Sequence, residues 1–167
     1  MKPGDHPDFF RLPPPPGRSR ESTIRLDALG RFWHEGRLLE HAGMATAFAS
    51  WIARHPDDGR YILNNGYDWS YFEVEDVPFF VRGVRIEQGW PILALSDGSQ
   101  ERLDPHELRV GAGDALYTKV KQGSFAARFT PGAQLALSPL LVEGDGGRPE
   151  LRVGGERYAI EGAGAAP

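Results

Sequence analysis

The residues whose types and spacing best suit chemistry lie in a short acidic segment, residues 72–76. Glu73 and Glu75 alternate with apolar residues, so in an extended strand their carboxylates share one face, roughly 7 Å apart. Two carboxylates at this spacing could share a proton, act as acid and base, or hold a divalent cation. Together with Asp76, and with His34 as a further ligand, they define one hypothesis, a metal-assisted hydrolase.

The same segment also has a structural interpretation, which the sequence favours. If the chain reverses at Val77-Pro78, Glu73 lies opposite Arg82 on the next strand and forms an ordinary cross-strand charge pair. Exposed pairs of this kind contribute little to stability. The chain contains no nucleophile elbow and no Walker or dinucleotide-binding glycine loop. An enzyme is therefore not the favoured class, and no cofactor is predicted.

A dense aromatic segment offers a second kind of candidate site. Tyr67, Trp69 and Tyr71 would share one face of an extended strand. If the next residue, Phe72, faces the core, this row points outward, and an exposed aromatic row is typical of a binding surface. The alternative is that the row packs beneath the first helix or a neighbouring subdomain.

A binding site would then lie between residues 64–71 and the hairpin that carries Trp33 and His34. Arginines near the predicted turns could anchor an anionic group of the ligand. The predicted ligand-binding residues are Trp33, His34, Arg60, Tyr67, Trp69, Tyr71, Arg82 and Arg128.

These residues must be positioned by short strands and two helices. An apolar face at helical spacing predicts a helix over residues 42–55, ended by Pro56. Thr130-Pro131 has the form of an N-cap and first helical residue, which favours a second helix over a strand despite Pro139. Alternating apolar residues and glycine turns predict hairpins within residues 24–35, 70–87, 90–103, 116–129 and 151–160. The fold class is α+β, with short antiparallel strands in one or two sheets packed on two helices.

The predicted organisation is a flexible proline-rich arm (residues 1–22), a single α+β domain (23–160) and a tail (161–167). Within the domain, subdomains would cover about residues 23–88 and 89–160. Each predicted helix is followed by an acidic, glycine-containing turn that ends in arginine, at residues 57–60 and 145–148. Two similar αβ halves would explain this echo, and chance use of turn residues explains it equally well.

Composition excludes several functions. The chain of 167 residues has a net charge of −4 and no cysteine, so disulfides and thiol chemistry are absent and a reducing cytoplasm is the expected location. Its charges are interspersed, without the basic stripe that nucleic-acid binding requires. No stretch approaches the roughly 20 apolar residues of a membrane span. The partner, a small molecule or a protein, and the oligomeric state are left open.

Several segments together resemble a bacterial, mainly proteobacterial, family of unknown function. They are Ile24-Arg25-x-Asp27 with Gly30-Arg31-x-Trp33-His34-x-Gly36, Val74-Glu75-Asp76-x-Pro78-Phe79, and Gly123-x-x-x-Ala127-Arg128. Their order and spacing hold over about residues 23–160. The resemblance implies a compact α+β fold with repeated motifs and a role in signalling or ligand sensing, without assigned catalytic residues.

The sequence therefore predicts a small-molecule-binding or regulatory module. One alternative is the metal-assisted hydrolase that would use the acidic segment. The other is a protein-interaction module whose proline-rich arm docks on a partner.

Overall fold

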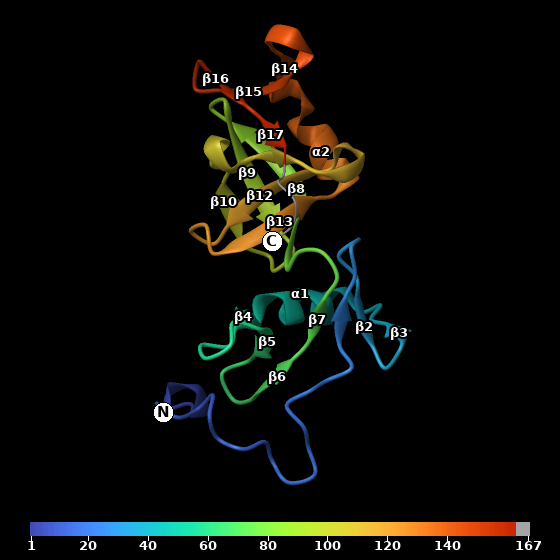
Figure 1. Cartoon of the computed structure of the whole chain (residues 1–167), viewed down its shortest axis with the longest axis vertical. Coiled ribbons are helices and arrows are strands. Elements are labelled where there is room, and N and C mark those ends of the chain that lie inside the picture. Colours follow the sequence, from blue (N-terminus) through green and yellow to red (C-terminus); the bar gives the residue numbers. More distant parts are fainter. Residues whose placement is uncertain (163–167) are drawn as a thin grey trace. The chain divides into compact units, whose positions relative to one another are not determined.

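The computed structural model describes residues 1–162 and has a mixed α+β architecture (Figure 1). The chain divides into two compact units, Met1–Pro78 and Phe79–Pro167. The sequence places a subdomain boundary near residue 88, whereas the structure places it after Pro78. The reason is that the strand beginning at Phe79 belongs to the large sheet of the second unit.

The first unit opens with a small four-stranded sheet of order β3-β2-β1-β7. Its strands are β1 (Arg25–Leu26), β2 (Phe32–His34), β3 (Arg37–Leu38) and β7 (Glu73–Val74). β1 and β2 form the predicted antiparallel hairpin, in which Gly30 takes a φ of +83°. β7 pairs with β1 in parallel.

The predicted reversal at Val77-Pro78 is wrong. Glu73 lies in register with Arg25 of β1, so it does not face Arg82 across a hairpin. Local turn residues suggested the reversal, but burial decides the pairing. Phe79 and its neighbours enter the core of the second unit, where their strand pairs with β9 (Trp90–Leu95) and β13 (Phe125–Phe129).

The first helix, α1 (Ala42–Ser50), is shorter than predicted. Its N-cap is His41, whose ring nitrogen accepts a hydrogen bond from the Met44 N–H. Residues 52–54, expected to continue the helix, form strand β4 instead, because Ile52 pairs with Leu63 in an antiparallel ladder. Tertiary pairing of a β-branched residue here overrides the helical periodicity.

A second sheet of the first unit follows α1 and has the order β4-β5-β6. Its strands are β4 (Ile52–Arg54), β5 (Tyr61–Asn64) and β6 (Trp69–Tyr71). All pairings in it are antiparallel. One face carries the fully buried Ile62 together with Trp69.

Residues 1–22 lie against this sheet. The sequence predicts a flexible arm, but the structure packs Phe9, which is 5% exposed, against Ile62 and Trp69. The segment contains a short 3-10 helix, η1 (Pro3–Asp5). The Gly4 N–H donates a hydrogen bond to the Gly66 carbonyl oxygen at 2.8 Å. Proline content stiffens the segment, and two phenylalanines give it an apolar surface to bury.

The second unit is built on a seven-stranded sheet of order β10-β9-β8-β13-β12-β11-β17. The strands are β8 (Phe79–Glu87), β9 (Trp90–Leu95), β10 (Gln100–Arg102), β11 (Arg109–Val110), β12 (Leu116–Val120), β13 (Phe125–Phe129) and β17 (Glu161–Gly162). The predicted hairpins β9–β10 and β12–β13 are confirmed.

A helix and a three-stranded sheet complete the second unit. Helix α2 (Pro131–Leu137) is capped by Thr130, as the sequence predicts. Pro139 lies just beyond it, in the first turn of a 3-10 helix where a missing N–H costs little. The sheet has the strands β14 (Leu141–Glu143), β15 (Pro149–Val153) and β16 (Glu156–Ala159). The 3-10 helices of this unit are η2 (Pro105–Glu107), η3 (Ala112–Asp114), η4 (Ser138–Leu140) and η5 (Asp145–Gly147).

From β11 to β17, the second unit repeats the order of strands and helix that the first unit has from β1 to β7. In the first, β1 pairs with β2 antiparallel and with β7 in parallel; in the second, β11 pairs with β12 and β17 in the same way. Each helix leads into a three-stranded antiparallel sheet, β4-β5-β6 or β14-β15-β16. The two echoing turns, residues 57–60 and 145–148, both fall between the first and second strands of these sheets. Equivalent positions can therefore be read from the strand registers.

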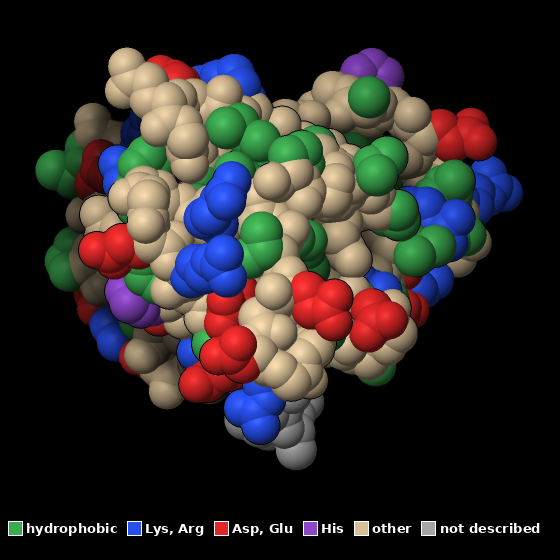
Figure 2. Space-filling view, turned by 90° about the horizontal axis from the view of Figure 1, so that it is seen from above, with side chains coloured by type: hydrophobic (Ala, Val, Ile, Leu, Met, Phe, Trp, Pro, Cys, Tyr) green, Lys and Arg blue, Asp and Glu red, His purple; other side chains and the backbone are tan. Residues whose placement is uncertain are grey.

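Neither helix in residues 1–162 is long and apolar enough to cross a membrane. On the face drawn in Figure 2, basic side chains lie among acidic ones.

Replacing Phe9 with alanine should lower the unfolding free energy of the first unit by about 2–4 kcal/mol, because it leaves a cavity beside Ile62 and Trp69. The matched control is Leu12→Ala, since Leu12 is 48% exposed, and it should change stability by less than about 0.5 kcal/mol. Urea denaturation followed by tryptophan fluorescence measures both variants. Small, equal effects would mean that the segment does not dock.

Candidate ligand-binding cavity in the first unit

The predicted aromatic row does not form an exposed surface. Tyr67 is 62% exposed, but Trp69 is only 5% exposed. The Trp69 ring lies edge-on to Tyr71 at 5.1 Å and to His55 at 4.8 Å, centroid to centroid. The N-terminal segment covers this cluster, and Phe9 supplies a carbonyl oxygen that accepts a hydrogen bond from Trp69 Nε1 at 3.3 Å. For Trp69, the alternative that the aromatic row is packed is therefore correct. The segment that covers it is the N-terminal segment, where the sequence suggested the first helix or a neighbouring subdomain.

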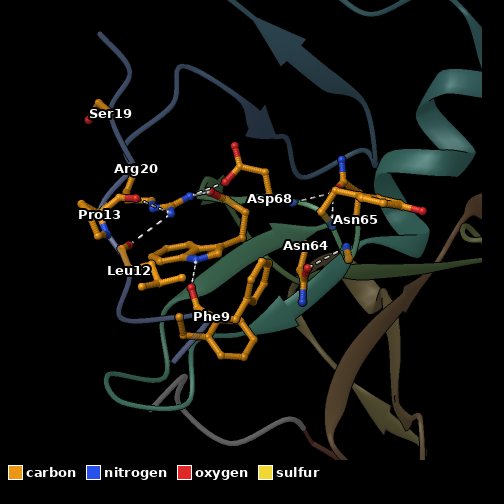
Figure 3. Close-up of polar contacts among 12 residues, drawn as sticks. Phe9, Leu12, Pro13, Ser19, Arg20, Asn64, Asn65 and Asp68 are labelled. Carbon is orange, nitrogen blue, oxygen red and sulfur yellow. Dashed lines mark hydrogen bonds and ion pairs between the residues drawn. The ribbon is translucent and has the colours of Figure 1, made fainter. Parts of the chain in front are cut away.

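Arg20 fastens the N-terminal segment to β6 (Figure 3). Its Nη1 donates to Asp68 Oδ1 at 2.5 Å and to the Trp69 carbonyl at 2.8 Å. Its Nη2 donates to the carbonyls of Leu12 and Pro13 at 3.2 and 3.3 Å. The guanidinium also lies over the Trp69 ring, 4.4 Å from the centroid. One side chain thus joins three parts of the chain by charge, hydrogen bonds and a cation–π contact.

A cavity of about 240 Å³ lies beside this clamp. The N-terminal segment forms one wall, α1 and its end a second, and β5, β6 and their connecting loop a third. The cavity is lined by Pro14, Pro15, Arg18, Ser19, Arg20, Ile24, Phe48, Trp51, Leu63, Asn65, Asp68, Trp69 and Ser70. Seven of these thirteen residues are apolar or aromatic and six are polar or charged, so the wall combines apolar surface with groups that could orient a small molecule.

One donor in the wall has no acceptor. The Nε–H of Arg20 is buried and makes no hydrogen bond within residues 1–162. Leaving a buried donor unpaired costs about 1–3 kcal/mol, and more when the group is charged. The Arg20 side chain is 16% exposed, whereas that of its partner Asp68 is 42% exposed. Arg20 therefore has one unsatisfied donor, which is inaccessible to solvent although the side chain as a whole lines the cavity.

The second unit has core leucines at the equivalent positions. By register, Leu108, Leu137 and Leu151 correspond to Ile24, Phe48 and Leu63. All three leucines are fully buried. Ile24 and Phe48 are only half-buried and border the cavity. The shared fold thus permits a closed core at this place, and the first unit leaves it open.

A second cavity, of about 320 Å³, lies in the second unit. Its lining residues are Pro105, His106, Arg109, Arg157, Tyr158, Ala159 and Glu161. Arg109 Nη1 already donates to the carbonyls of His106 and Leu108, and the Tyr158 hydroxyl donates to Glu156. The side chains of Arg109 and Tyr158 therefore already have hydrogen-bond partners within the unit.

The predicted residues Trp33 and His34 do not line the first cavity. Trp33 Nε1 donates to Asp27 Oδ2 at 2.9 Å, and the guanidinium groups of Arg25 and Arg31 lie 5.1 and 5.6 Å from its ring centroid. His34 is exposed at the end of β2. Trp33 therefore has a structural partner, Asp27, in its own hairpin.

Arg60 and Tyr71 meet outside the cavity. Arg60 forms a two-pronged ion pair with Glu21, at 2.9 and 3.0 Å, and its guanidinium lies 3.7 Å from the Tyr71 ring centroid. The Tyr71 hydroxyl donates to Asp58 at 2.7 Å. This hydrogen bond lowers the pKa of Asp58 and raises the pKa of Tyr71. The network fastens the end of the N-terminal segment, so Arg60 is not a free anion anchor.

Arg82 and Arg128 belong to the second unit, on β8 and β13, and neither lines the cavity of the first. The Arg128 guanidinium lies 5.7 Å from the Tyr117 ring centroid on the neighbouring strand. Of the eight predicted binding residues, the structure places one, Trp69, in the cavity wall.

The acidic segment is not assembled as a metal centre. Glu75 forms an ion pair with Arg25 at 2.5 Å and accepts a hydrogen bond from the Ala28 N–H. Glu73 lies beside Arg25 in the parallel register. Within residues 1–162 no three His, Cys, Asp or Glu side chains are grouped so that they could hold a metal ion.

Sequence reasoning missed most of the cavity wall. Phe48 and Trp51 were recognisable as the apolar face of the first helix, where burial is the ordinary expectation. Arg18 and Arg20 lie in a segment without periodicity, and no local signal marks them. Only the docking of that segment brings Arg20 to Asp68, 48 residues away in sequence.

Comparison with known proteins supports the fold. No protein-family model and no curated protein matches the chain. A DUF1285 family protein from Silicibacter pomeroyi has a similar structure, with a TM-score of 0.68 at 19% identity over 96% of this chain and 89% of that one. A DUF1285 family protein from Shewanella baltica gives a TM-score of 0.57 at 21% identity over 72% of this chain and 94% of that one. At such identities the likeness concerns the fold alone, and these two proteins, themselves of unknown function, indicate no specific activity.

Asp27 should make the first unit sensitive to acid. Burial raises its pKa, but hydrogen bonds from Trp33, Arg31 and Leu29 outweigh burial and hold the pKa below its ordinary value of 3.8. A depressed carboxylate pKa stabilises the fold above that value, and the stabilisation is lost as the pH falls through the folded-state pKa. Asp27→Asn should therefore weaken the loss of stability below about pH 4.

Urea denaturation between pH 2.5 and 7 measures this effect, with the exposed Asp145→Asn as the matched control. At neutral pH, Asp27→Asn should lower the unfolding free energy by about 1–3 kcal/mol, because it weakens a buried acceptor of hydrogen bonds from Leu29, Arg31 and Trp33. Identical acid profiles of Asp27→Asn and the parent protein would contradict this role.

Proposed function

We propose that the chain is a small-molecule-binding module whose site is the cavity beside Trp51 and Trp69. The observation that carries the proposal is the contrast between the units. Where the second unit fully buries Leu108 and Leu137, the first unit has half-buried Ile24 and Phe48 beside a cavity lined by apolar, aromatic and polar side chains. An open cavity forgoes packing energy, and occupancy by a ligand would restore it.

The wall formed by the N-terminal segment suggests a regulatory use of binding. Pro14, Pro15 and Arg18 belong to this segment, whereas Phe48 and Leu63 belong to the body of the unit. A ligand that touches both would stabilise the docked segment relative to a released one, by its difference in affinity for the two states. A partner that binds only the docked or only the released state would then respond to ligand binding, as in a signalling module.

The cavity volume limits the ligand. Sites for drug-sized molecules have volumes of about 300–1,000 Å³. At about 240 Å³ this cavity suits a smaller molecule, such as one with a single ring or a short chain. The rings of Phe48 and Trp51, which contact each other with centroids 5.4 Å apart, would form an apolar surface for it.

Thermal unfolding of the full chain against a panel of small metabolites tests the proposal. A ligand present at 100 times its dissociation constant stabilises by about 2.7 kcal/mol, which raises the midpoint by several degrees. Quenching of tryptophan fluorescence should accompany binding, because Trp51 and Trp69 line the cavity.

A cavity-filling variant locates the site. Ser70→Leu places a larger side chain in the cavity and should abolish the thermal shift. Ser124→Leu makes the same change at an exposed turn of the second unit and should preserve it. Equal shifts for the two variants, or no shift with any compound, would refute binding in this cavity.

A further inference from the structure

We infer that the cavity of the second unit binds the oxyanion group, carboxylate or phosphate, of a small molecule. Three features of its wall support this: an arginine with an open hydrogen-bonding edge, a backbone N–H without an acceptor, and an excess of positive charge. This site is separate from the cavity of the first unit, so it goes beyond the function proposed above and can be tested independently of it.

Arg109 provides a guanidinium that is held in place and has one open edge. Its Nη1 donates to the carbonyl oxygens of His106 and Leu108, at 2.7 and 2.9 Å, which uses both hydrogens of that atom. Nε and Nη2 make no hydrogen bond within residues 1–162. They form the side-on edge of the guanidinium, whose parallel N–H groups match two oxygens of a carboxylate or phosphate.

This open edge is accessible to a ligand. Arg109 is half-buried and lines the cavity. It has no side-chain nitrogen that is both buried and without a partner, in contrast to Arg20 of the first unit. The unpaired Nε and Nη2 of Arg109 are therefore exposed to solvent, and a bound oxyanion can replace the water that they contact.

Ala159 adds a backbone donor to the same wall. The Ile160 N–H bonds to the Pro149 carbonyl of β15, so the preceding N–H, that of Ala159, points away from β15. It makes no hydrogen bond in the described part of the chain. In the first unit the equivalent N–H, that of Tyr71, donates to the Arg20 carbonyl at 2.7 Å. A ligand oxygen would take the place that this carbonyl oxygen has there.

The repeat explains why a polar cavity is left at this place. By register, Arg157 and Tyr158 of β16 correspond to Trp69 and Ser70 of β6, and each pair lines the cavity of its own unit. On the helix side, where the first cavity continues, the second unit is closed by its buried leucines. What remains open is the space between β16 and the segment before β11, and an arginine replaces the buried tryptophan there.

The charge of the cavity favours an anion. Arg109 and Arg157 contribute two positive charges to the lining, and Glu161 contributes one negative charge. Arg157 Nη1 lies 3.8 Å from Glu150 Oε1, beyond hydrogen-bonding distance, and its side chain is 58% exposed. Arg157 can therefore turn toward a ligand. The lining has one positive charge in excess, which an oxyanion would neutralise.

NMR titration of the full, ¹⁵N-labelled chain with matched probes tests the inference. Acetate and methyl phosphate carry the two oxyanion groups, and acetamide is the uncharged counterpart of acetate. We expect at least one of the anions to bind about tenfold or more tightly than acetamide, because charge-assisted hydrogen bonds replace neutral ones. The anion that binds more tightly identifies the group. The Ala159 amide proton should shift downfield as its N–H gains an acceptor.

Arg157→Gln is the informative variant, because Arg109 also holds the backbone of the segment before β11. It should weaken binding of the preferred anion about fivefold or more without changing the unfolding midpoint of the free protein. Glu161→Gln should tighten binding, since Glu161 lies beside Arg109 in the parallel register and repels an anion. Arg148→Gln is the matched control: Arg148 is exposed in the same unit, does not line the cavity, and should not alter the affinity.

The outcomes separate this site from the cavity of the first unit. Equal affinities for the anions and acetamide, or equal effects of Arg157→Gln and Arg148→Gln, would overturn the inference. Anion binding that Ser70→Leu abolishes would also overturn it, because that variant fills the first cavity alone. If no probe shifts the Ala159 resonance, the oxyanion site is refuted, while the metabolite panel still decides the function proposed for the first cavity.

Discussion

The guanidinium of Arg20 is the interaction on which the first unit depends. It binds Asp68 and the Trp69 carbonyl on one side, and the carbonyls of Leu12 and Pro13 on the other. An ion pair alone at the surface would contribute little. Here the charge is mostly buried, shared among four acceptors and stacked on an indole ring, so the N-terminal segment is held in one position.

The outer face of the β4-β5-β6 sheet explains why that segment must dock. Ile62, Trp69 and Tyr71 make this face apolar and aromatic, and Phe9 covers it. At the equivalent positions of β15 and β16 the second unit carries Glu150, Arg157 and Ala159, which water can solvate. The same strand framework thus needs a cover in one unit and none in the other, and the difference lies entirely in side-chain polarity.

The cavity follows from the same docking. A segment fixed at Phe9 and at Arg20 must span the distance between them, and its prolines keep Pro14 and Pro15 extended along one wall. Half-buried Ile24 and Phe48 border the space that remains, where the second unit closes its core with leucines. The N-terminal segment therefore forms part of the site, and a bound ligand would contact both this segment and the body of the unit.

The sequence by itself determined the α+β class, the hairpins at Gly30, Gly98 and Gly123, and the Thr130 cap of α2, because turn and cap chemistry act within a few residues. It also singled out Trp69, but for an exposed face that the fold covers. Only the tertiary structure decided that residues 52–54 leave the helix for a strand, that Glu73 lies beside Arg25 and not Arg82, and that Arg20 meets Asp68. These outcomes rest on pairings and burial between distant segments, whose energies no local pattern of residues encodes.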